Sequence, residues 1–316
     1  MRDATVIKDF YTVQIGSETS DLFERLFAQF EQPAAGALAR VIRDRQWPLT
    51  PGDKAALAVW VALQYLRSEG VRRSQTQMRA QTIRLLVGVS GKESLRRHIE
   101  AAEGEVVDDA RLDAEWRDLT QPGGPELKED VDSHIRTVLD MLQPTAMMLT
   151  SLQWSLSVFQ RKALVTSDHP VTLVPHEDHP RWSGVGLANA GGYALPLARR
   201  LGLIIGASRH LPDLRVSGTA KLASSLNGNV VLNARKAIFH HPDDTEVLAG
   251  VHLPPQRTME IGPVNDDHFI REEGLFTGLD SDQLRALSPP QADLDRGFSL
   301  DDLPWPIPGR RFQLPD

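Results

Sequence analysis

Apolar residues recur at helical spacing through the first half of the chain. Thr50 and Pro51 form a helix start signal, and the nearly continuous apolar run that follows predicts a central, largely buried helix over residues 54–67. The same periodicity predicts further helices on both sides of it, over residues 20–30, 34–45, 72–87, 94–102 and 126–142. Pro33 is expected to interrupt the first helical stretch, and Pro144 is expected to lie beyond the end of the last.

The pattern changes near Met147, where apolar and polar residues begin to alternate. This alternation predicts a strand over residues 148–159, and two β-prone segments flank the turn at residues 166–170. Residues 193–197 and 201–205 are expected to form two strands joined at Arg199 and Arg200. A helix capped by residues 217–219 is expected to run, with interruptions, through Ala237. In the first half of the chain, the acidic, turn-rich residues 104–124 are expected to form a surface loop.

Helices followed by strands indicate an α+β fold, in which an N-terminal helical half packs on a mostly antiparallel, strand-rich half. We expect a helical region over residues 1–146 and a strand-rich region with a closing helix over residues 147–253. The two regions are expected to form one composite domain. Residues 254–316 are rich in Pro, Gly and Asp and are expected to form an arm that contains little regular structure.

Composition removes several classes of function. The 316-residue chain has no cysteine, which excludes disulfides, cysteine nucleophiles and cysteine metal sites. Its net charge of −7 argues against a general nucleic-acid binder. No apolar run approaches the roughly 20 residues that span a bilayer. Because the first nine residues lack the apolar core of a signal peptide, we expect a soluble, cytoplasmic protein without a membrane partner.

Six segments occur in an order that resembles the domain-of-unknown-function family 4238 (DUF4238). They are DFYTV at 9–13, EQPAA at 31–35, LTP at 49–51 leading to ALQYLR at 62–67, VTSDHPV at 165–171, LPL at 195–197, and a final helix with Asn227 and Asn233 before AIF at 237–239. The resemblance covers roughly residues 5–245, and the T-S-D-x-P-V turn is its most specific part. It implies no defined activity. Members of the family begin with a His-x-x-Pro segment some tens of residues before the point where this sequence starts, so either the given start is late or that element is absent, and its absence would put activity in doubt if the histidine is catalytic.

Asp168 and His169 are the candidate catalytic residues. Asp168 lies in a turn between two β-prone segments, where a carboxylate can act as a general base or a metal ligand, and His169 can act as a nearby acid or base. The resemblance to the family supplies much of the reason for choosing them. The alternative is structural: Ser167 or Asp168 caps the turn through backbone N–H groups, and Pro170 fixes its geometry.

Polar residues within apolar helices form a second candidate set. Glu31, Gln64 and Arg67 could converge on the Asp168 turn and position a substrate, or they could form an internal network that ties helices to the sheet. Asn227 and Asn233 lie on or near the closing helix. Because asparagine is unfavourable inside a helix, these two residues mark a break, a cap or a turn, or they form hydrogen bonds to a ligand.

Two patches are dense in metal-ligand side chains. His176 and His179, with Asp168 and His169, could hold a metal, but the flanking prolines disfavour the helix that usually presents an H-x-x-H pair. The second patch covers residues 240–244. Both patches are also typical of solvated loops. The common phosphate-binding glycine motifs and the G-x-S-x-G elbow are missing, which weakens nucleotide-binding and α/β-hydrolase assignments.

These observations favour a hydrolase or nuclease-like enzyme with an Asp/His-centred polar site between the two halves. A divalent metal is its candidate cofactor, and its partner would be a small-molecule or polymer substrate. The alternatives are a non-catalytic binding or regulatory module whose polar residues form a structural network, and the remnant of an active ancestor. In the non-catalytic reading, the C-terminal arm contacts a partner or joins two copies into a homo-oligomer.

Overall fold

A computed structural model of the chain describes residues 13–15, 18–20, 22–128, 131–176, 178–179, 184–209, 211–253 and 270–274. These residues divide into two compact units. The first contains the described residues up to Val71 and from Val131 to Leu253, and the second contains those from Arg72 to Lys128 and residues 270–274. The sequence-based boundaries at residues 146 and 253 remain predictions, and most of the expected C-terminal arm lies outside the described residues.

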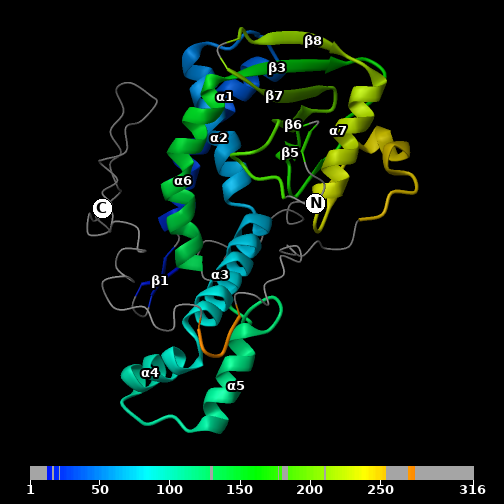
Figure 1. The fold of residues 1–316 in the computed structure, drawn as a ribbon. Coiled ribbons are helices and arrows are strands. Elements are labelled where there is room, and N and C mark those ends of the chain that lie inside the picture. Colours follow the sequence, from blue (N-terminus) through cyan, green and yellow to red (C-terminus); the bar gives the residue numbers. More distant parts are fainter. Residues whose placement is uncertain are drawn as a thin grey trace. The chain divides into compact units, whose positions relative to one another are not determined.

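A five-stranded sheet organises the first unit (Figure 1). Its order is β5 (Thr172–Val174), β6 (Gly192–Ala198), β7 (Leu201–Arg209), β3 (Leu152–Phe159) and β8 (Leu214–Gly218). The first four strands pair antiparallel, and β8 runs parallel to β3. The fold is therefore α+β with a mostly antiparallel sheet, as the sequence predicts. The tight connection at Arg199 and Arg200 also lies where expected.

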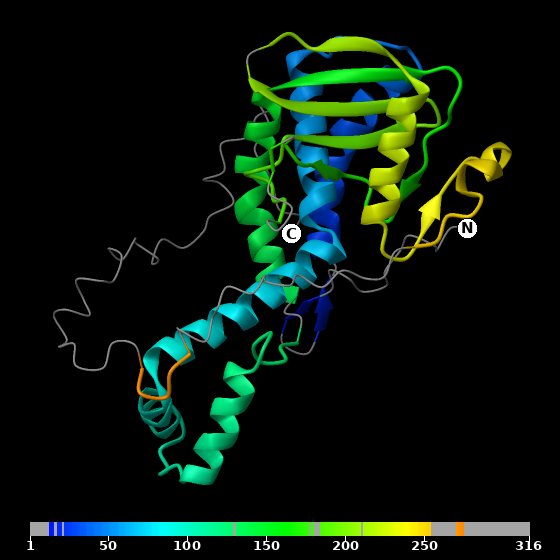
Figure 2. The same cartoon turned by 45° about the vertical axis from the view of Figure 1, so that its right-hand side comes forward.

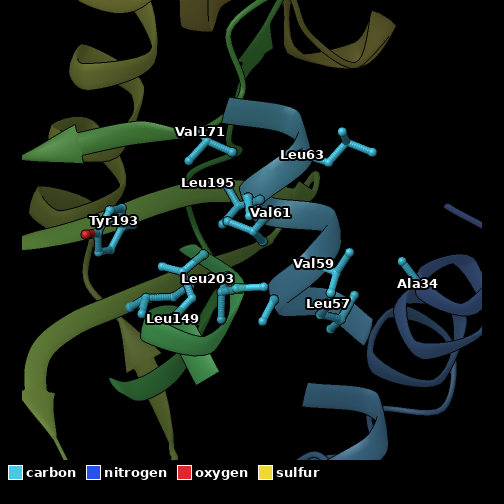
Figure 3. Packing of buried hydrophobic residues seen from close by; sticks show 14 of the residues in the cluster. Ala34, Leu57, Val59, Val61, Leu63, Leu149, Val171, Tyr193, Leu195 and Leu203 are labelled. Carbon is cyan, nitrogen blue, oxygen red and sulfur yellow. The ribbon is translucent and has the colours of Figure 1, made fainter. Parts of the chain in front are cut away.

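Three helices cover one face of this sheet: α1 (Leu22–Ile42), α2 (Pro51–Leu66) and α6 (Val131–Ser151) (Figures 1 and 2). The central helix α2 is capped by Thr50, whose Oγ1 accepts the backbone N–H of Asp53 over 3.1 Å. Figure 3 shows α2 contributing Leu57, Val61 and Leu63 to a core that also holds Leu195 and Leu203 from the sheet. Burial of this aliphatic surface is the main force that joins the helices to the sheet.

The opposite face of the sheet carries α7 (Ala220–Asn233), which packs Ala223 and Leu226 against Phe159, Leu164 and Ala194 (Figure 2). The helix begins at the expected place, with Thr219 as its N-cap. It ends at Asn233 instead of Ala237. The remaining elements of this unit are two small antiparallel sheets and a 3-10 helix: β1 (Val13–Ile15) with β2 (Glu18–Ser20), β4 (Thr166–Ser167) with β9 (Ile238–Phe239), and η1 (Pro242–Leu248).

The prolines do not end helices as the sequence suggests. Helix α1 continues through Pro33, and α6 continues through Pro144. Pro144 is exposed, as is Asp140, whose carbonyl loses its usual helical partner and can bind water instead. Packing of the buried stripe of α6 offsets the proline cost of about 3 kcal/mol. Because α6 continues to Ser151, the strand predicted over residues 148–159 begins only at Leu152.

The second unit is helical. It contains most of α3 (Glu69–Ser90), together with α4 (Lys92–Glu103) and α5 (Asp109–Thr120). Its small core holds Leu95, Val107, Leu112 and Trp116, with Ile270 packed against it. The prediction of a turn-rich surface loop over residues 104–124 is therefore wrong, because helix α5 lies within this range and buries Leu112 and Trp116. Among the described residues, no helix is long and apolar enough to cross a membrane.

Candidate functional site

Both carboxylate oxygens of Asp168 accept hydrogen bonds from backbone N–H groups, and these bonds hold the turn in place. Strands β4 and β9 bring it beside the segment that leaves α7. Asp168 Oδ1 accepts the N–H of Arg235 over 3.0 Å, and Oδ2 accepts the N–H of Lys236 over 2.9 Å. The backbone N–H of Asp168 donates to Ala237 over 3.2 Å. The carboxylate thus provides hydrogen-bond acceptors for two backbone N–H groups that lie just after the end of α7.

His169 performs a similar role for α3. Its Nε2 accepts the backbone N–H of Gly70 over 3.1 Å. An accepting Nε2 carries no proton, so the ring is neutral, with its proton on Nδ1. Burial is the main cause that lowers the pKa of His169, the nearby charge of Arg235 lowers it further, and the charges of Asp168 and Glu69 oppose the change. The neutral form is thereby favoured.

Two further contacts complete this polar cluster. Ser167 Oγ accepts the N–H of His169 over 3.1 Å and donates to the carbonyl of the same residue over 3.0 Å. Lys236 and Glu69 form an ion pair of 2.6 Å. We call the set of Glu69, Gly70, Asp168, His169 and Lys236 the Asp168 junction. It connects the start of α3, the turn after β4 and the segment after α7.

The other predicted substrate-binding residues of α1 and α2 form a local pair. Arg67 donates to Glu31 Oε1 over 2.5 Å, which ties the end of α2 to α1. Gln64 is half-buried on α2. This pair joins two helices. The internal network that would tie helices to the sheet, and the convergence of these residues with Gln64 on the Asp168 turn, both remain predictions.

Asn227 and Asn233 lie in different environments on α7. Asn227 is buried, and its amide spans one backbone segment: Oδ1 accepts the N–H of Val165 over 3.1 Å, and Nδ2 donates to the carbonyl of Ala163 over 2.9 Å. Asn233 is exposed and donates to the carbonyl of Asn229 within the helix. The side-chain amide of Asn227 thus hydrogen-bonds a backbone N–H and a backbone carbonyl of residues 163–165, as the backbone of a paired strand would. A role for either residue in ligand binding stays a prediction.

The proposed metal ligands lie in a turn between β5 and β6. His179 donates its backbone N–H to the carbonyl of His176 over 3.1 Å, and the side chain of His176 is exposed. Within the part of the chain that the structure describes, no group of three or more His, Asp or Glu residues could hold a metal ion. Glu177 and Pro180 of this patch lie outside the described residues.

The second unit has an open pocket of about 670 Å³ between α4, α5 and residues 270–274. Its charges pair with one another: Lys92 contacts Asp113 at 2.5 Å, and Arg96 contacts Asp109 at 2.6 Å. The hydrogen bond from Lys92 holds the pKa of Asp113 below its ordinary value. These contacts make the pocket an ion-pair network that connects α4 to α5.

Sequence reasoning missed three members of the Asp168 junction, Glu69, Gly70 and Lys236. A signal for the first two was present, because Ser68 precedes Glu69 and its Oγ accepts the N–H of Val71 over 3.3 Å at the start of α3. Lys236 had no such signal. It reaches the junction only because Asp168 binds the chain directly after α7.

Comparison with known proteins gives one family. The family described as "Protein of unknown function (DUF4238)" matches residues 1–244. Neither the search of curated proteins nor the search of solved structures returned a match. The family match covers both the Asp168 turn and α7, and it ends shortly before the C-terminal arm that the sequence predicts.

Proposed function

The chain belongs to the DUF4238 family, and within it we propose that this protein is a non-catalytic binding or regulatory module. One observation carries the proposal: both carboxylate oxygens of Asp168 accept backbone N–H groups, from Arg235 and Lys236. Each oxygen keeps a second lone pair, but these two hydrogen bonds fix the orientation of the carboxylate toward the segment after α7, whereas a general base must be aimed at a substrate. Here the carboxylate is aimed at its own chain.

His169 supports the same proposal. Its unprotonated nitrogen accepts the N–H of Gly70, and the backbone groups of His169 bond to Ser167. The only nitrogen of the ring that could accept a proton is therefore engaged at the start of α3. A histidine in this position stabilises the helix start and is poorly placed to remove a proton from a substrate.

The competing proposal is the hydrolase or nuclease-like enzyme. It draws support from the meeting of Asp168, His169 and Glu69 in one cluster and from the lowered pKa of His169, because perturbed groups gather at active sites. In that case the hydrogen bonds to Gly70, Arg235 and Lys236 would position the catalytic groups. We keep the cytoplasm as the proposed location under both proposals.

Replacing Asp168 decides between the two. We expect Asp168→Ala to lower the free energy of unfolding by about 1–3 kcal/mol, because two backbone N–H groups lose their acceptor. Asp168→Asn keeps one acceptor oxygen and should lose less. Asp140→Asn, at an exposed site on α6, is the matched control and should change stability by less than about 0.5 kcal/mol.

The same variants are assayed on nucleic acids and on phosphate, ester and peptide substrates. Under our proposal, no turnover by the wild-type protein depends on Asp168. The proposal is wrong if the wild-type protein turns over one of these substrates and folded Asp168→Asn, with unfolding unchanged, does not. That result would establish the enzyme.

A further inference from the structure

Strand β8 forms one edge of the five-stranded sheet. It pairs with β3 on one side, and no other strand of the described residues pairs with its second side. Figures 1 and 2 show it at the outer margin of the sheet. An edge strand presents backbone N–H and C=O groups that can bind another strand.

The side chains of β8 leave this edge accessible. Leu214 is 43% exposed and Val216 is 37% exposed, although both belong to the apolar type that sheets usually bury. Each is in register with a serine of β3, Ser155 or Ser157, and so lies on the same sheet face as α7. Helix α7 packs on that face against Phe159, Leu164 and Ala194, and Leu214 and Val216 remain partly exposed on it.

The strand also carries few of the devices that usually block edge pairing. Its sequence, LRVSG, contains neither proline nor lysine, and it is five residues long, compared with three for β5 at the opposite edge. Arg215 is the one charged residue in it. The edge is therefore suited to pairing with a strand whose position opposite Arg215 does not carry another positive charge.

We propose that β8 binds β8 of a second copy of this chain, antiparallel and related by a two-fold axis at Val216. This alignment pairs the full strand with itself, because Val216 is its central residue. Val216 then faces its own copy, Leu214 faces Gly218, and Arg215 faces Ser217. The two sheets become one continuous sheet across the dimer.

Charge argues against one of the two neighbouring alignments, and the other, with its axis at Ser217, pairs only three of the five residues of the strand with one another. An axis at Arg215 would place two arginines directly opposite each other, which destabilises a strand pair. With the axis at Val216, the hydroxyl of Ser217 faces each guanidinium stem, and Leu214 lies opposite Gly218, beside the Phe159 ring that packs against that glycine. The strand is thus complementary to itself, as a two-fold interface requires. A short strand pair buries less than the roughly 800 Å² per partner of a standard interface, so the dimer is weak and depends on concentration.

Sedimentation velocity over a wide range of concentration tests this dimer. We expect wild-type protein to dimerise, and Val216→Lys and Val216→Glu each to weaken the dimer at least tenfold by placing like charges at the axis. A mixture of the two variants should recover dimerisation as a heterodimer. Leu232→Lys, at a 48% exposed leucine on α7, is the matched control and should dimerise as the wild type does.

A cross-link provides a test that does not depend on a charged substitution. The chain has no cysteine, so Val216→Cys introduces a single thiol opposite its own copy. Directly opposed residues of antiparallel strands have Cα atoms about 4.5–5.5 Å apart, within the range of a disulfide. We expect mild oxidation to produce a covalent dimer for Val216→Cys and little for Leu232→Cys.

Three results would overturn the proposal. The first is wild-type protein that stays monomeric at every concentration, which would leave the edge to a different protein partner. The second is a dimer that Val216→Lys does not weaken, which would place the contact elsewhere, such as the C-terminal arm. The third is equal cross-linking of the Val216→Cys and Leu232→Cys variants.

Discussion

Gly70 and His169 contact each other with no side chain between them. The N–H of Gly70 donates to His169 Nε2 over 3.1 Å, and a Cβ on Gly70 would lie only 2.6 Å from that nitrogen. The contact therefore needs a residue without a Cβ on one side and a neutral imidazole on the other. Both requirements lead to measurable effects on stability.

Gly70→Ala should destabilise the protein by about 1–2 kcal/mol, because the new methyl group displaces the His169 ring and removes its hydrogen bond. Alanine by itself favours a helix over glycine by nearly 1 kcal/mol. In a His169→Ala background, only the flexible side chain of Arg235, whose Nε would lie 2.9 Å from the new Cβ, has to move, so the same substitution should be neutral or stabilising. Urea unfolding of the four proteins of this double-mutant cycle measures the change of sign. Equal effects in both backgrounds would show that the two residues are not coupled.

Acid should weaken the fold through His169. Its pKa in the folded protein is lowered from the ordinary value of 6.5, mainly by burial, so the unfolded chain binds the proton more readily. The contribution of the neutral ring is complete above pH 6.5 and is lost as the pH falls through the folded-state pKa. His169→Gln keeps an acceptor for Gly70 but does not titrate. The difference in unfolding free energy between wild type and this variant should therefore shrink or reverse below pH 6.5, and a difference independent of pH would contradict the assignment.

Asn227→Asp should destabilise the protein by about 1–3 kcal/mol at neutral pH. The substitution replaces the amide donor to the carbonyl of Ala163 with an oxygen and places a charge in a buried site. Asn233→Asp is the matched control on the same helix, and it should cost less than about 1 kcal/mol, because its side chain is exposed although the change places a negative charge at the end of the helix. Thermal unfolding compares the two. Similar losses would mean that the two hydrogen bonds of Asn227 carry little stability.

Gly91→Ala should destabilise the second unit through backbone strain at a positive φ and through a steric clash with Gly274. Gly104→Ala is the control that separates these two effects. Gly91 has φ of 83°, and a Cβ there would lie 2.5 Å from the backbone nitrogen of Gly274. Gly104 has a similar φ of 75° but no atom within 4 Å of its Cβ position. Gly104→Ala should therefore cost only the backbone strain of about 1 kcal/mol.

The excess loss in Gly91→Ala measures the contact with residues 270–274. That segment is fixed at this point by the N–H of Lys92, which donates to the carbonyl of Glu272 over 2.7 Å. Hydrogen exchange of the Lys92 amide should accelerate in Gly91→Ala and stay unchanged in Gly104→Ala. Equal exchange in the two variants would remove the contact as a cause.

Local pattern was enough for the elements whose signals agree with their packing. Thr50 and Pro51 start α2 as expected, Thr219 starts α7, and the strands on both sides of Arg199 and Arg200 lie where alternation places them. The pattern failed at Pro33, at Pro144 and in α5. In each case, a buried apolar face sustains a helix that the local residues disfavour.

For the site, the sequence identified Asp168, His169 and Asn227 as unusual polar residues but left their roles open. The roles depend on which backbone groups lie opposite, and those groups come from residues 62–99 positions away in the chain. Spacing along the sequence contains no information about such partners. Gly70 is the clearest case, because its importance follows only from the ring that packs against it.

The sequence by itself determined the α+β class, the central buried helix and the exclusion of cysteine chemistry, because these follow from composition and short-range periodicity, and the order of six short segments identified the family. The tertiary structure decided that Asp168 and His169 bind backbone groups of their own chain, and that β8 lies at an edge of the sheet where no other strand of the described residues pairs with it. Both depend on long-range packing, in which burial of apolar surface selects the neighbours and the polar groups then pair with whatever the packing places beside them.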